Sequence, residues 1–200
     1  MIKNFREECA RMESRILRPV ISEEELFALF SRLHFNKEDY PDMCQVHAAV
    51  RRTVSACAWF GCPDKQNRTA CIVTLGAGVD ELEEQYQLAG ELLKAYQLQC
   101  ISGELLRKCY EELSLFFQGR FGQEIGAYLF PGEELPLSWN GQILSQSGQK
   151  TVTCNQAYML KPKKSVVILA QLSGKGRKRA GSICENCNNT DCTERRTGLE

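Results

Sequence analysis

The sequence has little histidine and no excess of charge of either sign. His34 and His47 are its only histidines, and neither has a suitably spaced catalytic or metal-binding partner, so we expect structural or surface roles for both. Basic and acidic residues number 25 each. The short basic clusters at 161–164 and 175–179 lack the interleaved aromatic residues that nucleic-acid binding uses. We therefore expect no His-based active site and no nucleic-acid partner.

Long apolar runs and familiar enzyme motifs are also missing. No stretch reaches the roughly 18 apolar residues of a membrane span, and the mixed charges of MIKNFREECARMESRILRPV are unlike a signal peptide. There is no nucleophile elbow and no HExxH motif. The segment GAGVD has neither the third glycine of a dinucleotide site nor a P-loop lysine, so we expect a turn in which Asp80 caps a helix. The chain is predicted to be cytoplasmic, with no membrane segment.

Local patterns predict one α+β domain over residues 1–173, followed by a basic linker and a Cys-rich tail over 174–200. Ser22 and Glu25 form a capping box for a helix whose apolar face is predicted to be Leu26, Phe27, Phe30 and Leu33. We expect one helix from Asp80 through Tyr96 and another capped by Ser102. Strands are predicted at 70–76, at the start of the segment 151–172 before a turn at 161–164, and at 165–172 after that turn. The segment 53–60 fits either a helix end or a strand. The glycine-rich segment 119–148 is predicted to be largely irregular.

Eleven cysteines without an export signal indicate reduced thiols rather than a disulfide framework. Six of them mostly fall among apolar residues, where a thiol behaves as a small hydrophobic group. These are Cys9, Cys44, Cys57, Cys71, Cys100 and Cys109.

The tail differs, because Cys184, Cys187 and Cys192 are separated only by polar residues that form tight turns. Converging thiolates favour zinc or an iron–sulfur cluster. Three thiolates are one short of a closed tetrahedral site. The fourth ligand is expected from Cys62 or Cys154, from a partner, or from substrate or water.

Several motifs in order resemble the free-standing relatives of the activation domain of cobalamin-dependent methionine synthase, which are common in anaerobic bacteria. They are TLGAGVDELEEQYQLAGELLKAYQLQCISGELLRKCYEEL, FPGEELPL, YMLKPKKSVV and CENCNNTDC, and they cover about residues 73–196. The resemblance implies a curved antiparallel sheet with flanking helices. It also implies a cobalamin-binding methionine synthase or another corrinoid protein as partner, and a flavoprotein or ferredoxin as electron donor.

The resemblance also implies a site for S-adenosylmethionine. Pro131 and Gly132 match the Pro-Gly of the family's Arg-x-x-Pro-Gly-Tyr loop. Tyr128 or Leu129 stands where the family has arginine, and Glu133 replaces the tyrosine. Carboxylates on the preceding helix are expected to contact the amino or ribose groups of the ligand, chiefly Glu104 and Glu111, with Glu112 beside them.

Two functions follow from these residues. The first is an accessory protein for the reductive reactivation of a corrinoid protein, with S-adenosylmethionine as methyl donor. The second is a non-catalytic module that has lost S-adenosylmethionine and uses the tail cysteines to hold metal or to sense redox state or corrinoid. The missing arginine favours the second function, and the order of the remaining motifs favours the first.

Overall fold

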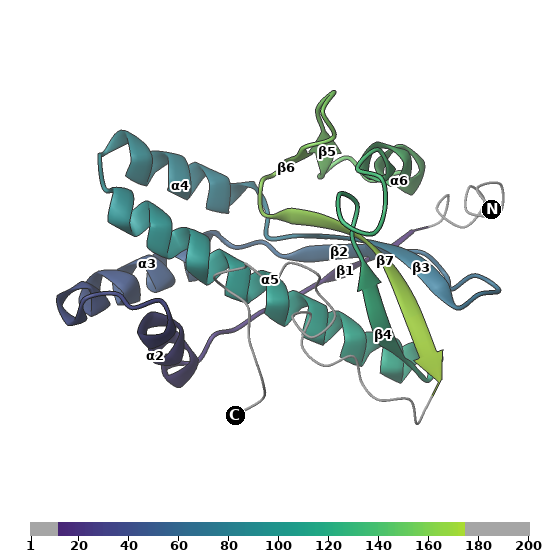
Figure 1. Cartoon of the computed structure of the whole chain (residues 1–200), viewed down its shortest axis with the longest axis horizontal. Helices are drawn as coiled ribbons and strands as arrows, with labels where there is room; N and C mark the ends of the chain where they lie inside the picture. Colours follow the sequence, from purple (N-terminus) through teal and green to yellow (C-terminus); the bar gives the residue numbers. More distant parts are fainter. Residues whose placement is uncertain (1–11, 175–200) are drawn as a thin grey trace.

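The computed structural model describes residues 12–174, which form the α+β domain in Figure 1. Its helices are α2 (Glu23–Arg32), α3 (Tyr40–Thr53), α4 (Ala77–Leu88), α5 (Leu92–Phe121) and α6 (Trp139–Ser147), with a 3₁₀ turn at Lys37–Asp39. The strands are β1 (Glu13–Ile16), β2 (Cys57–Phe60), β3 (Arg68–Thr74), β4 (Gln123–Leu129), β5 (Thr153–Cys154), β6 (Leu160–Lys161) and β7 (Ser165–Gly174). The predicted α+β class is confirmed. The predicted tail lies outside the described residues.

Five strands form one antiparallel sheet in the order β1-β2-β3-β7-β4. The centre pairs β3 with β7, from Arg68 opposite Gln171 to Thr74 opposite Ser165. All residues of β3 after Arg68 are buried, as expected for an apolar, β-branched strand covered on both faces. β4 forms one edge, and its register shifts between Ile125 and Ala127. β5 and β6 form a separate two-stranded sheet.

The two faces of the sheet bury different cores. Cys71 and Val73 of β3 belong to the larger core, which includes Leu105 and Phe117 of α5. Their neighbours in β3 alternate to the other face and join Ile143 of α6 in a smaller core. The long helix α5 therefore covers one face (Figure 1), while α6 and the β5–β6 hairpin cover part of the other.

The predicted start of α2 is confirmed. Ser22 accepts the backbone N–H of Glu25, and the Glu25 carboxylate accepts the N–H of Ser22, so the capping box is complete. The predicted apolar face was wrong at Phe27, which is exposed, because the helix buries Leu29 beside Leu26 and Phe30.

The predicted boundaries of α4 and α5 were wrong. α4 begins at Ala77 behind Gly76, and Asp80 does not cap it but accepts the backbone N–H of Lys163 at 2.7 Å. A turn at Gly90, whose φ is 76°, separates α4 from α5, although one helix was expected to continue to Tyr96. Ser102 caps nothing, since its hydroxyl donates to the Leu98 carbonyl inside the 30-residue helix α5.

The glycine-rich segment contains more regular structure than expected, because β4 and α6 both lie within it. The segment 53–60, which fitted either a helix end or a strand, contains both, because α3 ends at Thr53 and β2 begins at Cys57. The strand predicted for 165–172 is confirmed as β7, whereas the preceding strand is reduced to the short β5–β6 hairpin.

None of the helices within residues 12–174 combines the length and the apolar character needed to cross a membrane.

Candidate ligand site on α5 and β4

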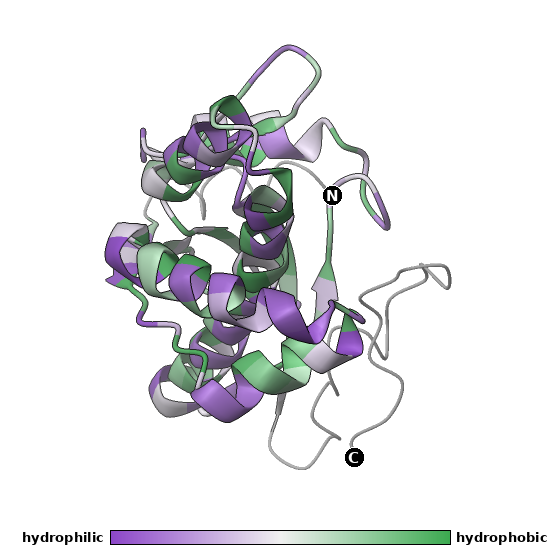
Figure 2. Cartoon of the chain, turned by 90° about the vertical axis from the view of Figure 1, so that its left-hand side faces the viewer, coloured by the Kyte–Doolittle hydropathy of each residue, from purple (hydrophilic) through white to green (hydrophobic). Residues whose placement is uncertain are grey.

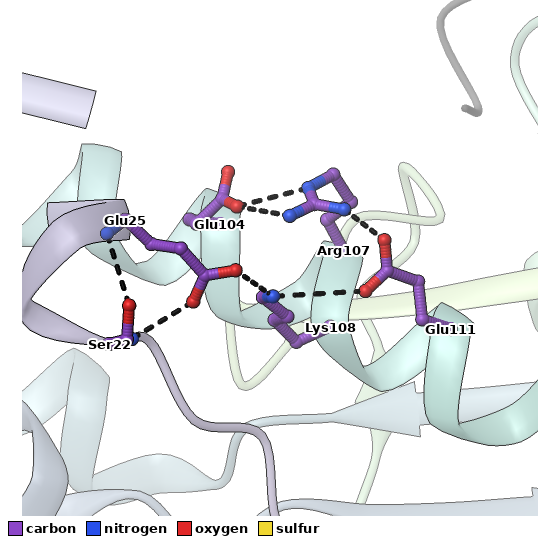
Figure 3. Close-up of polar contacts among 6 residues, drawn as sticks. All are labelled: Ser22, Glu25, Glu104, Arg107, Lys108 and Glu111. Atoms are coloured by element: carbon purple, nitrogen blue, oxygen red, sulfur yellow. Dashed lines mark hydrogen bonds and ion pairs between the residues drawn. The ribbon is translucent and has the colours of Figure 1, made fainter. Parts of the chain in front are cut away.

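One face of α5 carries a ladder of acidic and basic side chains (Figure 3), consisting of Glu104, Arg107, Lys108 and Glu111. The Arg107 guanidinium donates through Nε to Glu104 Oε1 at 3.1 Å and through Nη2 to the same oxygen, while its Nη1 binds Glu111. Lys108 binds Glu25 of α2 and lies 4.0 Å from Glu111 Oε2. The spacing of three and four residues brings these side chains together on one helix face.

The members of the ladder differ in their exposure to solvent. Glu104 is buried, Arg107 and Lys108 are half-buried, and Glu111 is exposed on about half of its side chain. Burial lowers the pKa of Arg107, but the hydrogen bonds and charges of Glu104 and Glu111 outweigh it, and the pKa is raised. With Glu25 included, three carboxylates face two cations. The cluster carries one net negative charge, and Glu111 is its accessible acceptor.

Aromatic side chains extend this face toward β4. The ring of Tyr128 lies 5.8 Å from that of Tyr110 and 6.4 Å from that of Phe130, measured between centroids. The Tyr128 hydroxyl donates to the Tyr110 carbonyl at 3.4 Å. Burial raises the pKa of Tyr128, and the charge of Glu111 adds to the shift. Glu111 and Tyr128 therefore lie within electrostatic reach of each other.

Pro131 and Gly132 form a closed turn directly after β4. Gly132 has a φ of 98° and donates its N–H to the Leu135 carbonyl at 2.7 Å. Glu133 donates its N–H to the Phe130 carbonyl at 3.1 Å, and Phe130 donates its own N–H to the Glu134 carboxylate at 2.9 Å. The amides of Phe130, Gly132 and Glu133 are thus satisfied within the turn.

These residues fit the cationic groups of S-adenosylmethionine better than its carboxylate. The exposed carboxylate of Glu111 and the net negative ladder suit the cationic sulfonium and amino groups. Among the described residues, no unengaged cation stands where the resemblance would place the carboxylate anchor: Tyr128 occupies the arginine position, and Arg107 is held by two glutamates. Arg120 pairs with Glu13 of β1 at 2.7 Å.

The predicted site residues are therefore only partly brought together. Glu104 and Glu111 share the ladder, and Tyr128 leads into the Pro131–Gly132 turn. Glu112 points elsewhere, accepting the backbone N–H of Arg18 at 2.8 Å. Sequence reasoning missed Arg107 and Lys108, although the Glu-x-x-Arg-Lys-x-x-Glu spacing is itself a signal of helical ion pairs.

A second polar cluster was also missed in the sequence. The buried carboxylate of Glu83 on α4 accepts from Gln87 at 3.1 Å, from Gln99 of α5, and from Lys163 at 3.5 Å. Lys164 Nζ in turn donates to the side-chain amide oxygen of Gln99. Because these groups satisfy one another, the cluster anchors the β6–β7 turn on the two helices.

The cysteine predictions have mixed outcomes. Cys71, Cys100 and Cys109 are buried, as expected, and burial raises the pKa of Cys109 to about 12. Cys57 is half-buried, while Cys44 is exposed, contrary to prediction.

The proposed metal ligands Cys184, Cys187 and Cys192 lie outside the described residues, as does Cys9. Of the two suggested fourth ligands, Cys62 is exposed and Cys154 half-buried. Within residues 12–174, no three His, Cys, Asp or Glu side chains are grouped to hold a metal ion.

Neither protein-family models nor curated protein sequences give a match to this chain.

Proposed function

We propose that this protein reactivates a corrinoid protein, such as a cobalamin-dependent methionine synthase, by docking on it when its cobalt has been oxidised. The α+β domain is proposed to be of the methionine synthase activation type. One electron from a reduced flavoprotein or ferredoxin, followed by transfer of the methyl group of S-adenosylmethionine as a cation, would convert cob(II)alamin to methylcobalamin and release S-adenosylhomocysteine. The chain's own residues would bind and orient the methyl donor.

The observation that carries the proposal is the contact of Tyr110, the residue before Glu111 on α5, with Tyr128 of β4, whose ring centroids lie 5.8 Å apart. Glu111 lies in the first motif of the resemblance, and Tyr128 precedes the FPGEELPL motif, whose Pro131–Gly132 turn follows β4. A cationic ligand would meet the half-exposed Glu111 carboxylate there. The half-buried Arg107, itself bound to the buried Glu104, would hold that carboxylate in position.

Calorimetric titration of the full chain with S-adenosylmethionine tests this part of the proposal, both alone and with a cob(II)alamin-loaded corrinoid protein. We expect binding that Glu111→Gln weakens about tenfold, as for loss of one charge-assisted contact. Glu112→Gln is the matched control, because Glu112 faces Arg15 and the Arg18 amide instead. The absence of binding in both settings would remove the methyl-donor role.

A second function is favoured by a specific observation, the engagement of Arg107 by both Glu104 and Glu111. With no unengaged cation among the described residues of the α5–β4 site to receive a ligand carboxylate, the domain would serve as a non-catalytic module that binds a corrinoid protein. The tail cysteines would then hold metal or sense redox state. A corrinoid protein that binds the chain with equal affinity with and without S-adenosylmethionine would support this alternative.

A further inference from the structure

A row of aromatic rings crosses the helical end of the domain. It runs from Phe27 of α2 to Tyr40, on to Phe30 and Phe35, and ends at Tyr96 of α5, with successive ring centroids 5.5, 5.0, 5.6 and 5.6 Å apart. Phe30 is buried in the core, whereas the two ends of the row are open to solvent, with Phe27 57% and Tyr96 52% exposed. The row therefore joins the core to the surface at two places.

Exposed leucines at the α4–α5 turn lie beside the Tyr96 end of this row. Leu92 and Leu93 precede Tyr96 by four and three residues, so they lie beside it on α5. Leu92 is 68% exposed, and Leu88, on the other side of the turn, is 82% exposed. Figure 2 views the molecule from this end, where the helices carry both hydrophilic and hydrophobic residues. We call Phe27, Phe35, Tyr40, Leu88, Leu92, Leu93 and Tyr96 the helical-end surface.

Single exposed leucines are ordinary, but a group of exposed leucines and aromatic rings is typical of an interaction site. Tyrosine and phenylalanine are also enriched at protein interfaces, since they bury a large area at little conformational cost. The grouping therefore indicates a surface that another molecule covers.

The charges around the helical-end surface decide which kind of molecule fits it. The negative residues next to Phe27, Phe35 and Tyr40 in the sequence are Glu23, Glu24, Glu38, Asp39 and Asp42, and the positive ones are Arg32 and Lys37. Glu91 and Lys94 neutralise each other across 2.7 Å. The border thus has an excess of negative charge, although the whole chain has none. A second copy of the chain would meet like charges there, and an anionic membrane would be repelled.

We propose that the helical-end surface docks a protein segment that presents apolar side chains flanked by lysine or arginine. The apolar rings and leucines would bury the partner's apolar residues, and the acidic border would select for its basic flanks. This inference does not depend on the proposed reactivation function, because it uses none of the residues of the α5–β4 site.

Two synthetic amphipathic helices of about five turns test the proposal by fluorescence anisotropy with the full chain, one built from Leu and Lys and the other from Leu and Glu. We expect the Leu/Lys peptide to bind at least about tenfold more tightly, with an affinity that falls as salt is added. Leu92→Gln with Tyr96→Ser should weaken this binding about tenfold. Leu115→Gln, at a leucine 54% exposed farther along α5, should leave it unchanged.

Three outcomes would overturn the proposal. The wild-type chain could bind neither peptide, or the Leu115 variant could weaken binding as much as the double variant. Alternatively, vesicles of phosphatidylglycerol could bind the chain and lose that binding in the double variant, which would make the surface a lipid contact. Since all substituted side chains are solvent-exposed, an unchanged circular dichroism melting curve verifies that each variant is folded.

Discussion

The Glu25 carboxylate on α2 binds the Lys108 ammonium group on α5 through one oxygen and accepts the Ser22 N–H at 2.9 Å through the other. One side chain thus completes the helix cap of α2 and joins that helix to the charged ladder on α5 (Figure 3). Arg18 makes a second link nearby, donating its backbone N–H to Glu112. The position of α2 on α5 is therefore set by polar contacts as well as by the core residues Leu26 and Phe30.

Replacing Glu25 should cost more stability than replacing its partner. We expect Glu25→Ala to lower the free energy of unfolding by about 1–2 kcal/mol, because it removes both the capping box and the ion pair. Lys108→Met should lower it by less than about 1 kcal/mol, since it removes only a partly exposed ion pair. Urea unfolding measures both, with Glu23→Ala as the exposed control on the same helix turn. A larger loss for Lys108→Met would contradict the dual role of Glu25.

The turn after β4 should depend on glycine at one position. Gly132→Ala is expected to destabilise the fold by roughly 1–2 kcal/mol, because φ is 98° and an added Cβ would lie 3.2 Å from Leu137 Cδ1. Gly119→Ala, at a helical position with nothing within 4 Å of the added Cβ, should be neutral or slightly stabilising. Thermal unfolding of the two variants gives the comparison. Equal melting temperatures would mean that the turn tolerates side chains.

His47 should make the stability of the domain depend on pH. Burial chiefly, with the charge of Arg51, lowers its pKa in the folded state, and its Nε2 is buried without a hydrogen-bond partner within the described residues. The unfolded chain, with a pKa of about 6.5, takes up the proton first as the pH falls. The free energy of unfolding should therefore be greatest above about pH 6.5 and decline below it, down to the lowered pKa.

Urea unfolding of wild type and His47→Leu between about pH 5 and 8 measures this decline. The variant should flatten the pH dependence in that window. His34→Asn is the control, because His34 is exposed and asparagine tolerates its φ of 54°. An unchanged pH slope in the His47 variant would assign the decline to other groups.

The metal prediction for the tail can be tested independently of any activity. Protein purified without oxygen should contain iron with acid-labile sulfide, or zinc, and Cys184→Ala, Cys187→Ala and Cys192→Ala should each lower the metal content to near zero. Cys44→Ala, at an exposed cysteine on α3, should retain it. Metal content unchanged in all three tail variants would refute the site.

Local signals predicted the parts of the fold that depend on neighbouring residues. The α2 capping box needs only Ser22 and Glu25, and the apolar segment of β3 specifies a buried strand wherever its partners come from. Ser102 was wrongly predicted to cap a helix, because a serine hydroxyl can bind either the backbone N–H groups at a helix start or a carbonyl of the preceding turn. Here it binds the Leu98 carbonyl, and the surrounding core keeps α5 continuous.

Elements and sites that depend on distant residues were harder to predict. The edge strand β4 is stabilised by pairing with β7, which follows it in sequence by many residues. In the candidate site, sequence motifs identified Glu104, Glu111 and Tyr128 but not Arg107, whose role follows from having both glutamates within reach. Helix spacing alone does not say which charges remain available to a ligand.

We propose that this chain restores an oxidised corrinoid protein. The direct measurement is the absorption spectrum of a cob(II)alamin-loaded methionine synthase that lacks its own activation domain, mixed with reduced flavoprotein or ferredoxin and S-adenosylmethionine, with and without the full chain. We expect methylcobalamin to form at least about tenfold faster when the chain is present. Equal rates with and without it would contradict the claim.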